Sequence, residues 1–475
     1  MSAIEVSARR SPGTWAWALV ALFVPLHIFA WLGRAAGDDF AAVIVGSRVI
    51  HDGYPELLYS MDPVNFARID ASDEWVDAAE AVGATNVFIH PYVYNPLIAK
   101  LTAPLTGSHD FQWFLTWNLV LITLGIVAMV WGSVELVRQA TNIDLWRPDV
   151  VAALLAALSL CEPIRLGIWL GQNSAIIGGC AILGIALARK HPAIAGALIA
   201  IAATIKLTPL ALVVVLLVFR KTRLAGVWAA GWTAVCGLAT YFISGHELIS
   251  LWIGRLRFIS EGIVLEPVNQ SFSAVLGRFA FGERAQIPGL PLFEVPAWTG
   301  AVALAAGWLV ICVALAVSLT APKQARYPVL IIAALMWPLI FASIAWSHYM
   351  ALVLPAVLLY TTVAWHLPQP QRKPALVLPI LIGVLLLTRV AFSVTDQRLP
   401  SGTMFEVPEA SFFAVVLAYL GLFLVPMLMK RAGLPAGTQR PGHGRHRAAA
   451  EPTTRRRSRA GQVNDRIPTR YNPPR

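Results

Sequence analysis

Charged residues are scarce in this sequence: they make up 13% of its 475 residues, against 57% for hydrophobic ones. Soluble domains carry roughly 25% charged residues, so a soluble globular protein is excluded. The four cysteines lie in or beside apolar runs without paired spacing, which excludes a disulfide framework and a thiolate metal site. Internal repeats, heptads and Gly-rich phosphate loops are missing as well. Long apolar runs dominate the chain.

These apolar runs have the length that spans a bilayer, about 20 residues or somewhat less. The first follows Arg9 and Arg10, and a polar insert from about 34 to 110 separates it from the second. The runs lie near 14–33, 111–137, 149–163, 173–188, 193–206, 207–219, 224–244, 297–320, 328–345, 349–366, 375–391 and 412–429. The sequence therefore predicts an all-α integral membrane protein, a polytopic bundle of about twelve transmembrane helices with a large first extracytoplasmic loop.

Positive charge indicates which side the loops face, because Lys and Arg accumulate in cytoplasmic loops. Alternation from an inside N-terminus places 25 of the 37 Lys and Arg residues on the cytoplasmic side. This count requires a break at Lys206, where Thr208 and Pro209 also interrupt the apolar stretch 193–219. A single helix there would invert every later loop, so we expect two short helices that meet at Lys206.

Basicity is concentrated at the C-terminal end of the chain. From Lys430 to Arg475 there are 12 Lys and Arg against 2 acidic residues, so this segment carries +10 of the formal net charge of +11. It is rich in Gly, Pro, Ala and Arg and lacks apolar periodicity, which is typical of disorder. We expect a cytoplasmic N-terminus at 1–13, a transmembrane domain at 14–430 and a disordered basic cytoplasmic tail at 431–475.

Polar side chains that suit chemistry collect on the outer face of this topology. Ionisable groups at membrane depth are costly and usually mark function. Asp38 and Asp39 follow the first span, where they act either as a general base or as helix caps. Lys206 at the helix break either holds a lipid phosphate or reaches the interface as a snorkelling lysine. His348 either steadies a phosphate leaving group or belongs to an interfacial aromatic belt.

Further polar residues on this face have two interpretations each. Arg165 either binds a phosphate or pairs with Glu162 in a local salt bridge. The amide pairs at span ends either stitch helices together or bind hydroxyls. They are Gln172 with Asn173 and Asn269 with Gln270. The sequence alone leaves these alternatives open.

Seven short motifs occur in a fixed order along the chain. They are Asp39-Phe40, Tyr94-Asn95-Pro96-Leu97, Glu162-Pro163-Ile164-Arg165, Gly171-Gln172-Asn173, Ile205-Lys206-Leu207-Thr208-Pro209, Asn269-Gln270-Ser271 and Trp346-Ser347-His348. Together they resemble glycosyltransferase family 87, the polyprenyl-phosphate-sugar-dependent enzymes of the GT-C superfamily. The resemblance runs from about residue 14 to 430 and implies a transferase in the plasma membrane whose site is extracytoplasmic.

The resemblance implies a function and roles for these residues. It predicts transfer of a sugar, most simply mannose by an α-1,2-mannosyltransferase-like enzyme, from a polyprenyl-phosphate donor to a lipid-linked glycan acceptor, with inversion. Asp39 is the expected base, with Asp38 as the adjacent candidate. Lys206, Arg165 and His348 are expected at the donor phosphate. Residues expected to bind substrate are Tyr94, Asn95, Glu162, Gln172, Asn173, Asn269 and Gln270.

Three other functions remain open at this point. One is transfer of arabinofuranose from the analogous lipid donor. Another is a lipid-sugar transporter or flippase, and the third is a ligase-type or structural membrane protein. Neither a cofactor nor an obligatory metal is expected, because Asp38 and Asp39 stand without a further acidic cluster. No nucleic-acid partner is expected; the partners are the membrane and the two lipid-linked substrates.

Overall fold

The computed structural model describes residues 14–62, 64, 71–281, 292–294, 297–388 and 409–434. The predicted segment 1–13, the end of the run 375–391 and almost all of the predicted tail lie outside these residues. The first half of the chain contains α1 (Thr14–Trp31), α2 (Asp38–His51), η1 (Pro55–Tyr59), α3 (Asp73–Ala81), α4 (Pro96–Thr106), α5 (Phe111–Thr141), α6 (Pro148–Leu160), α7 (Glu162–Leu170), α8 (Ser174–Leu187), α9 (Pro192–Ile205) and α10 (Leu210–Val218).

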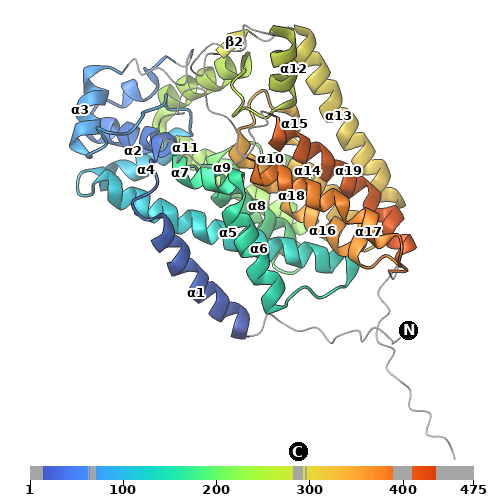
Figure 1. Ribbon diagram of the computed structural model, residues 1–475. Helices are drawn as coiled ribbons and strands as arrows, with labels where there is room; N and C mark the ends of the chain where they lie inside the picture. Colours follow the sequence, from blue (N-terminus) through green and yellow to red (C-terminus); the bar gives the residue numbers. More distant parts are fainter. Residues whose placement is uncertain are drawn as a thin grey trace, which may run out of the picture. The chain divides into compact units, whose positions relative to one another are not determined.

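The second half is also mainly helical, with one short antiparallel pair of strands. Its elements are α11 (Arg223–Ser260), β1 (Gly262–Val264), α12 (Phe272–Phe281), β2 (Leu292–Glu294), α13 (Ala297–Thr320), α14 (Arg326–Met336), α15 (Pro338–Phe341), η3 (Ser347–Val353), α16 (Leu354–Trp365), α17 (Arg372–Ala375), α18 (Val377–Leu387) and α19 (Ala410–Arg431). Figure 1 shows their arrangement; α5 packs against α1, α6, α8, α14 and α16, and α8 also packs against α9. The predicted all-helical class is therefore confirmed in its main feature.

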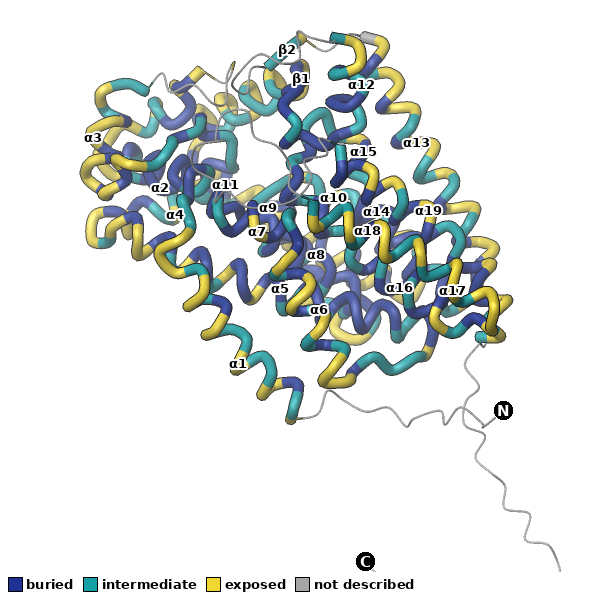
Figure 2. The backbone as a smooth tube through the Cα atoms, viewed as in Figure 1, coloured by how far each residue is buried: buried dark blue, intermediate teal, exposed yellow. Residues whose placement is uncertain are grey.

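Small residues hold α5 and α8 close together in the centre of the bundle. A Cβ added at Gly132 of α5 would lie 2.7 Å from the carbonyl oxygen of Ile182 in α8. A Cβ added at Gly179 of α8 would lie 2.8 Å from the Cα of Gly125 in α5. Membrane helices pack through such small residues because lipid supplies no hydrophobic driving force between them. Figure 2 shows the resulting buried centre, with α5, α8, α14 and α16 mostly dark blue.

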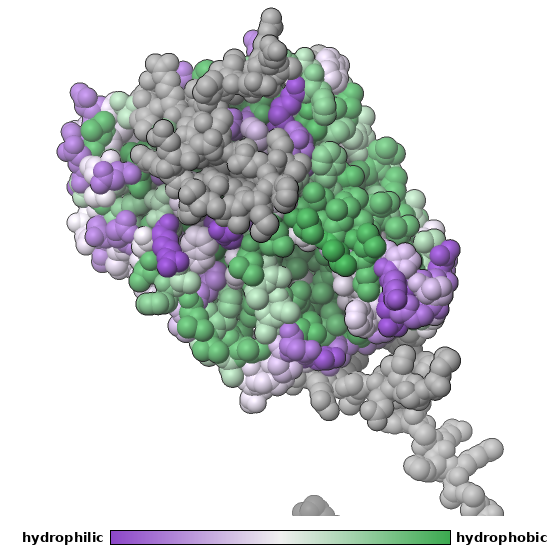
Figure 3. Space-filling model, viewed as in Figure 1, coloured by the Kyte–Doolittle hydropathy of each residue, from purple (hydrophilic) through white to green (hydrophobic). Residues whose placement is uncertain are grey.

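Several helices have the length and apolar character needed to cross a membrane. Among the described residues they are α1, α5, α11, α13, the continuous stretch Ser347–Trp365 and α19, and the bent pair α6–α7 adds a seventh if it counts as one span. Large apolar side chains such as Trp308 and Leu309 are exposed on α13, and Figure 3 shows an apolar band there. This is the surface of an integral membrane protein, since a soluble monomer does not expose such a band. Each of the twelve predicted runs contains a helix, and the number that span the bilayer remains a prediction.

The break predicted at Lys206 is present. α9 ends at Ile205, and Lys206 takes an extended conformation before α10 begins at Leu210. Pro209 stands directly before α10, where a missing backbone N–H costs nothing. The side chain of Lys206 therefore extends from the short segment that joins two helices.

The polar insert 34–110 is a small helical unit, where the sequence predicts only a large loop. α2, α3 and α4 enclose a hydrophobic cluster that includes Ile44, Leu58, Trp75, Tyr92 and Phe111. Trp75 and Tyr92 are almost completely buried. This core fixes α2, whose first residues are Asp38 and Asp39. The insert therefore places both carboxylates on a rigid element.

Candidate active site

A cavity of about 540 Å³ lies where the insert meets the helical bundle. Its wall is formed by the start of α2, the segment 88–95, the junction of α7 and α8, the break between α9 and α10, the second half of α11, and the segment 342–349. The residues predicted from sequence that line it are Asp38, Asp39, Tyr94, Asn95, Gln172, Asn173, Lys206 and His348. Residues far apart in the sequence thus meet in one site.

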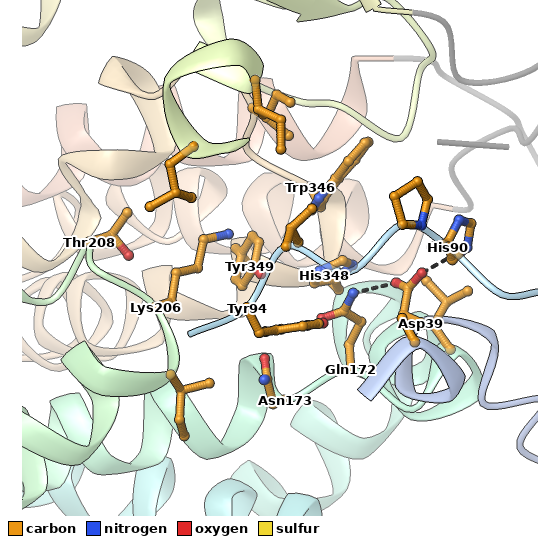
Figure 4. A pocket seen from close by; sticks show the side chains of 18 of the residues that line it. Asp39, His90, Tyr94, Gln172, Asn173, Lys206, Thr208, Trp346, His348 and Tyr349 are labelled. Atoms are coloured by element: carbon orange, nitrogen blue, oxygen red, sulfur yellow. Dashed lines mark hydrogen bonds and ion pairs between the residues drawn. The ribbon is translucent and has the colours of Figure 1, made fainter. Parts of the chain in front are cut away.

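Asp39 has hydrogen-bond donors on both carboxylate oxygens (Figure 4). His90 Nε2 lies 3.0 Å from Oδ1, and Gln172 Nε2 donates to Oδ2. Burial raises the pKa of this carboxyl, but the charge of the His90 imidazole and the hydrogen bonds from His90 and Gln172 outweigh burial and hold the pKa below its ordinary value of 3.8. Asp39 is therefore an ionised carboxylate, held in a fixed orientation.

Asp38 has a different set of contacts although it is adjacent in sequence. Its side chain is buried, and Oδ1 accepts a hydrogen bond of 3.0 Å from the backbone N–H of Phe88. Phe88 precedes His90 by two residues, so this bond ties the segment that carries His90 to the start of α2. Asp38 thus positions the partner of Asp39, so the two adjacent carboxylates, of which the sequence favours Asp39 as the base, have different contacts.

Two glycines allow the start of α2 to approach the end of α7. Gly37 and Gly171 both have positive φ, +76° and +71°, a conformation in which glycine alone is unstrained. A Cβ added at Gly171 would lie 2.8 Å from the Cβ of Phe40. The backbone N–H groups of Ala36 and Gly37 each donate to the carbonyl oxygen of Trp169 at 2.9 Å. This close approach brings Gln172 against Asp39.

Lys206 occupies another part of the same cavity, away from Asp39 (Figure 4). Its Nζ lies 3.6 Å from the centroid of the Tyr349 ring, in cation–π contact. Within the described part of the chain, no carboxylate forms an ion pair with it. An ammonium group held this way can attract an anion that enters the cavity.

The motif Asn269-Gln270 holds the segment that carries His348. Asn269 Oδ1 accepts from the Ala345 N–H at 2.9 Å, and its Nδ2 donates to the Val264 carbonyl at 2.8 Å. The Ser347 N–H donates to the Val268 carbonyl at 2.8 Å. Of the two interpretations open for this amide pair, the structure shows the first, in which the amides hold neighbouring segments of the chain together through hydrogen bonds. Neither amide lines the cavity.

Gln270 completes this arrangement at the start of α19. Its Oε1 accepts from the Phe412 N–H at 2.8 Å, and its Nε2 donates to the Pro267 carbonyl. Both amides of the motif are completely buried. The motif therefore acts on the site through the backbone that it holds.

Tyr94 and Asn95 enter the cavity from the segment that leads into α4. Asn95 caps α4, because its Oδ1 accepts from the Leu97 N–H at 2.9 Å. The Tyr94 ring points toward Gln172 (Figure 4), and its pKa is raised by burial and by the negative charge of Asp39. Its hydroxyl therefore keeps its proton and can donate a hydrogen bond.

Glu162 and Arg165 belong to α7 but do not line the cavity, as far as the described residues go. The Arg165 side chain is exposed. The roles predicted for these two residues at the substrate therefore stay predictions.

Sequence reasoning assigned no role to His90, Tyr349 or Trp252, which all line the cavity. His90 and Tyr349 stand close to predicted residues in the sequence, but no spacing rule links His90 to Asp39. Trp252 comes from the second half of α11, beyond the predicted run 224–244. A kink at Gly245 separates this second half from the first half of the helix. Only folding brings these three side chains to the site.

The helices and the cavity define a multi-pass membrane protein. Its cavity holds a fixed carboxylate and a lysine that has no carboxylate partner among the described residues. Sequence comparison identifies the family. The profile of Glycosyltransferase family 87 matches residues 92–341, which is more than half of the chain. The chain belongs to this family. Lys206, Gln172 and Asn173 fall inside the matched range, whereas Asp39 and His348 lie outside it.

Two curated relatives are similar over much of their length. Both are named polyprenol-phosphate-mannose-dependent alpha-(1-2)-phosphatidylinositol mannoside mannosyltransferase. The protein from Mycobacterium tuberculosis is 24% identical over 348 residues, which cover 68% of this chain and 75% of the relative. The protein from Mycolicibacterium smegmatis is 24% identical over 297 residues, which cover 58% of this chain and 63% of the relative.

Proposed function

We propose that this protein transfers mannose from a polyprenyl-phosphate donor to a hydroxyl group of a lipid-linked glycan acceptor, with inversion at the anomeric carbon. The observation that carries the proposal is a single cavity with an ionised, oriented carboxylate in one part and a lysine ammonium in another. Displacement at an anomeric carbon needs these two groups on opposite sides of the sugar. Family membership and the names of the two relatives support the choice of donor.

In this mechanism Asp39 takes the proton of the acceptor hydroxyl. The freed oxygen attacks the anomeric carbon while the bond between that carbon and the phosphate oxygen breaks. The electron pair leaves with the phosphate. General-base assistance of this kind contributes about 10²- to 10⁴-fold in rate. The hydrogen bonds from His90 and Gln172 keep the Asp39 carboxylate ionised and ready to accept the proton.

Lys206 stabilises the negative charge that develops on the leaving phosphate. A fixed cation in a site screened from water is effective because it needs no reorganisation during the reaction. A monophosphate leaving group needs less help than a diphosphate, so we propose that the reaction requires neither metal nor cofactor. Of the three residues expected at the phosphate, Lys206 carries this proposal. Arg165 does not line the cavity as described, and His348 lines it but lies between Lys206 and Asp39 (Figure 4).

A small apolar space adjoins Lys206 and leaves the surroundings of its ammonium group poor in competing polar groups. A second cavity of about 40 Å³ shares Lys206 and Tyr349 with the first and continues between apolar side chains, among them Leu212, Leu335 and Leu339.

We also propose that the site faces the extracytoplasmic side, with both termini cytoplasmic and about twelve spans. The helix break at Lys206 supports this topology, because the count of spans depends on it. A reporter fused after Arg431 tests the assignment of sides. A cytoplasmic signal is expected, and a periplasmic signal would contradict the topology.

The reaction is tested with purified protein, labelled polyprenyl-phosphate-mannose and a lipid mannoside acceptor. We expect product with the wild type and a rate about 10²- to 10⁴-fold lower with Asp39→Asn. Asp52→Asn is the matched control, because the exposed Asp52 lies at the other end of α2 and pairs with the half-buried Arg48 outside the cavity lining. Its activity should be unchanged.

Other outcomes of this assay point to other functions. Equal product from wild type and Asp39→Asn would remove Asp39 as the base. Product with a polyprenyl-phosphate-arabinose donor alone would indicate an arabinofuranosyltransferase. Failure with both donors, together with movement of a lipid-linked sugar across vesicles, would indicate a transporter.

A further inference from the structure

His348 is an unusual buried residue. Its side chain is 2% exposed, yet neither Nδ1 nor Nε2 has a hydrogen-bond partner among the described residues. Buried polar atoms in folded proteins are almost always hydrogen-bonded, and leaving one unpaired costs about 1–3 kcal/mol. His348 lines the cavity, between Lys206 and Asp39 (Figure 4). Both nitrogens are therefore free to bind something that enters the cavity.

Asn173 also has a buried polar atom without a hydrogen-bond partner among the described residues. It stands at the N-cap of α8, where an asparagine normally accepts a hydrogen bond from the first turn of its helix. Its side chain makes no capping bond, and its buried Oδ1 has no partner in the described part of the chain. Asn95 is the contrast within this protein, because it caps α4 through Leu97 N–H. Asn173 faces the cavity and leaves its helix uncapped.

Resting on the proposed function, we infer that His348 and Asn173 form the subsite for the transferred sugar and hydrogen-bond to its ring hydroxyls. This assigns His348 to the sugar, where the sequence places it at the phosphate. In an in-line displacement the sugar ring lies between the base and the phosphate ligand, which is the position of His348 relative to Asp39 and Lys206 (Figure 4).

The chemistry of the two side chains fits the hydroxyl groups of a sugar ring. A neutral imidazole offers one donor and one acceptor, and an asparagine Oδ1 offers an acceptor. A sugar hydroxyl both donates and accepts, so one hydroxyl can donate to Asn173 while others pair with the two nitrogens of His348. The subsite therefore distinguishes sugars by the positions of their hydroxyl groups.

The test combines variants of these residues with altered donors. The donors are polyprenyl-phosphate-mannose and a set of monodeoxy analogues that each lack one ring hydroxyl, and kcat/KM is measured with a fixed lipid mannoside acceptor. The wild type should lose about ten- to hundredfold in kcat/KM with the analogue that lacks a contacted hydroxyl. His348→Ala should show a similar loss with mannose itself, and that same analogue should then cost it no more than about twofold further.

Controls separate this proposal from simpler explanations. His246→Ala, a change at an exposed histidine of α11 outside the cavity lining, should behave as wild type with every donor. His348→Gln and Asn173→Ser keep the experiment decisive if the alanine variants fail to fold. Asn173→Ala should leave the melting temperature unchanged, whereas Asn95→Ala should lower it, because only Asn95 caps its helix.

Two results would overturn the inference, and they differ in scope. If each variant lowers kcat/KM by the same factor for every donor, the two side chains do not contact the hydroxyls, and the transferase function stands without this subsite. If the wild type transfers no sugar from any of these donors, the proposed function and the subsite both fall.

Discussion

Lys206→Met is the change that tests the phosphate site most directly. Methionine keeps the length and apolar stem of the side chain but removes its charge. The Lys206 ammonium lies over the Tyr349 ring without a carboxylate partner in the described residues, so its charge is available to a bound phosphate. Two unit charges at about 4 Å and an effective dielectric constant of about 20 interact by roughly 4 kcal/mol.

This energy corresponds to a loss of about 10²- to 10³-fold in kcat/KM. Stability should change in the opposite sense or not at all, because an ammonium group without a carboxylate partner loses hydration when the protein folds. Lys206→Met should therefore melt at the same temperature as wild type or higher. A coincident loss of activity and of stability would indicate a structural role.

The assay measures kcat/KM with polyprenyl-phosphate-mannose and inhibition by the free polyprenyl monophosphate. Lys206→Met should weaken that inhibition, while Lys206→Arg, which keeps the charge, should retain most of it. Lys190→Met is the matched control, because Lys190 pairs with Glu135 outside the cavity. A loss of less than about fivefold in kcat/KM for Lys206→Met would refute the role of this charge.

Three further outcomes follow from the contacts around Asp39. Asp38→Ala should lower the free energy of unfolding by about 1–3 kcal/mol, because the backbone N–H of Phe88 then loses its acceptor. Asp39→Asn should lower kcat more than stability, and thermal melts and initial rates on both variants check this. Gly171→Ala should destabilise by about 1–3 kcal/mol, because its Cβ would lie 2.8 Å from that of Phe40 at positive φ, and a melting temperature equal to wild type would contradict it. Because the pKa of Asp39 is held below 3.8, the base stays ionised at neutral pH, and kcat should not fall through its protonation until the pH drops below about 4. The stability that this carboxylate contributes is lost over the same pH range. A pH–rate profile whose acid limb disappears in Asp39→Asn would support this, and an acid limb near pH 6 that depends on Asp39 would contradict it.

The sequence by itself determined the fold class and the family. Long apolar runs can satisfy their backbone hydrogen bonds in lipid only as helices, so their number and length predict a helical membrane protein. The pattern Lys206-Leu207-Thr208-Pro209 also predicts the helix break, because a proline and a charge inside a short apolar stretch disfavour one continuous helix. The polar residues worth attention, Asp39 and Lys206 among them, were visible for the same reason: charge is expensive at membrane depth.

Tertiary structure decided which of these residues act together. Gln172 meets Asp39 across 133 residues of chain, and His90 meets it across the insert. No periodicity encodes such pairings. The two amide motifs look alike in sequence, yet the Asn269 side chain forms hydrogen bonds to backbone groups. The Asn173 Oδ1, in contrast, has no hydrogen-bond partner among the described residues. Local sequence sets what each side chain can bond to, but only the packing of α2 against α7 and the cavity between them determines what is within reach.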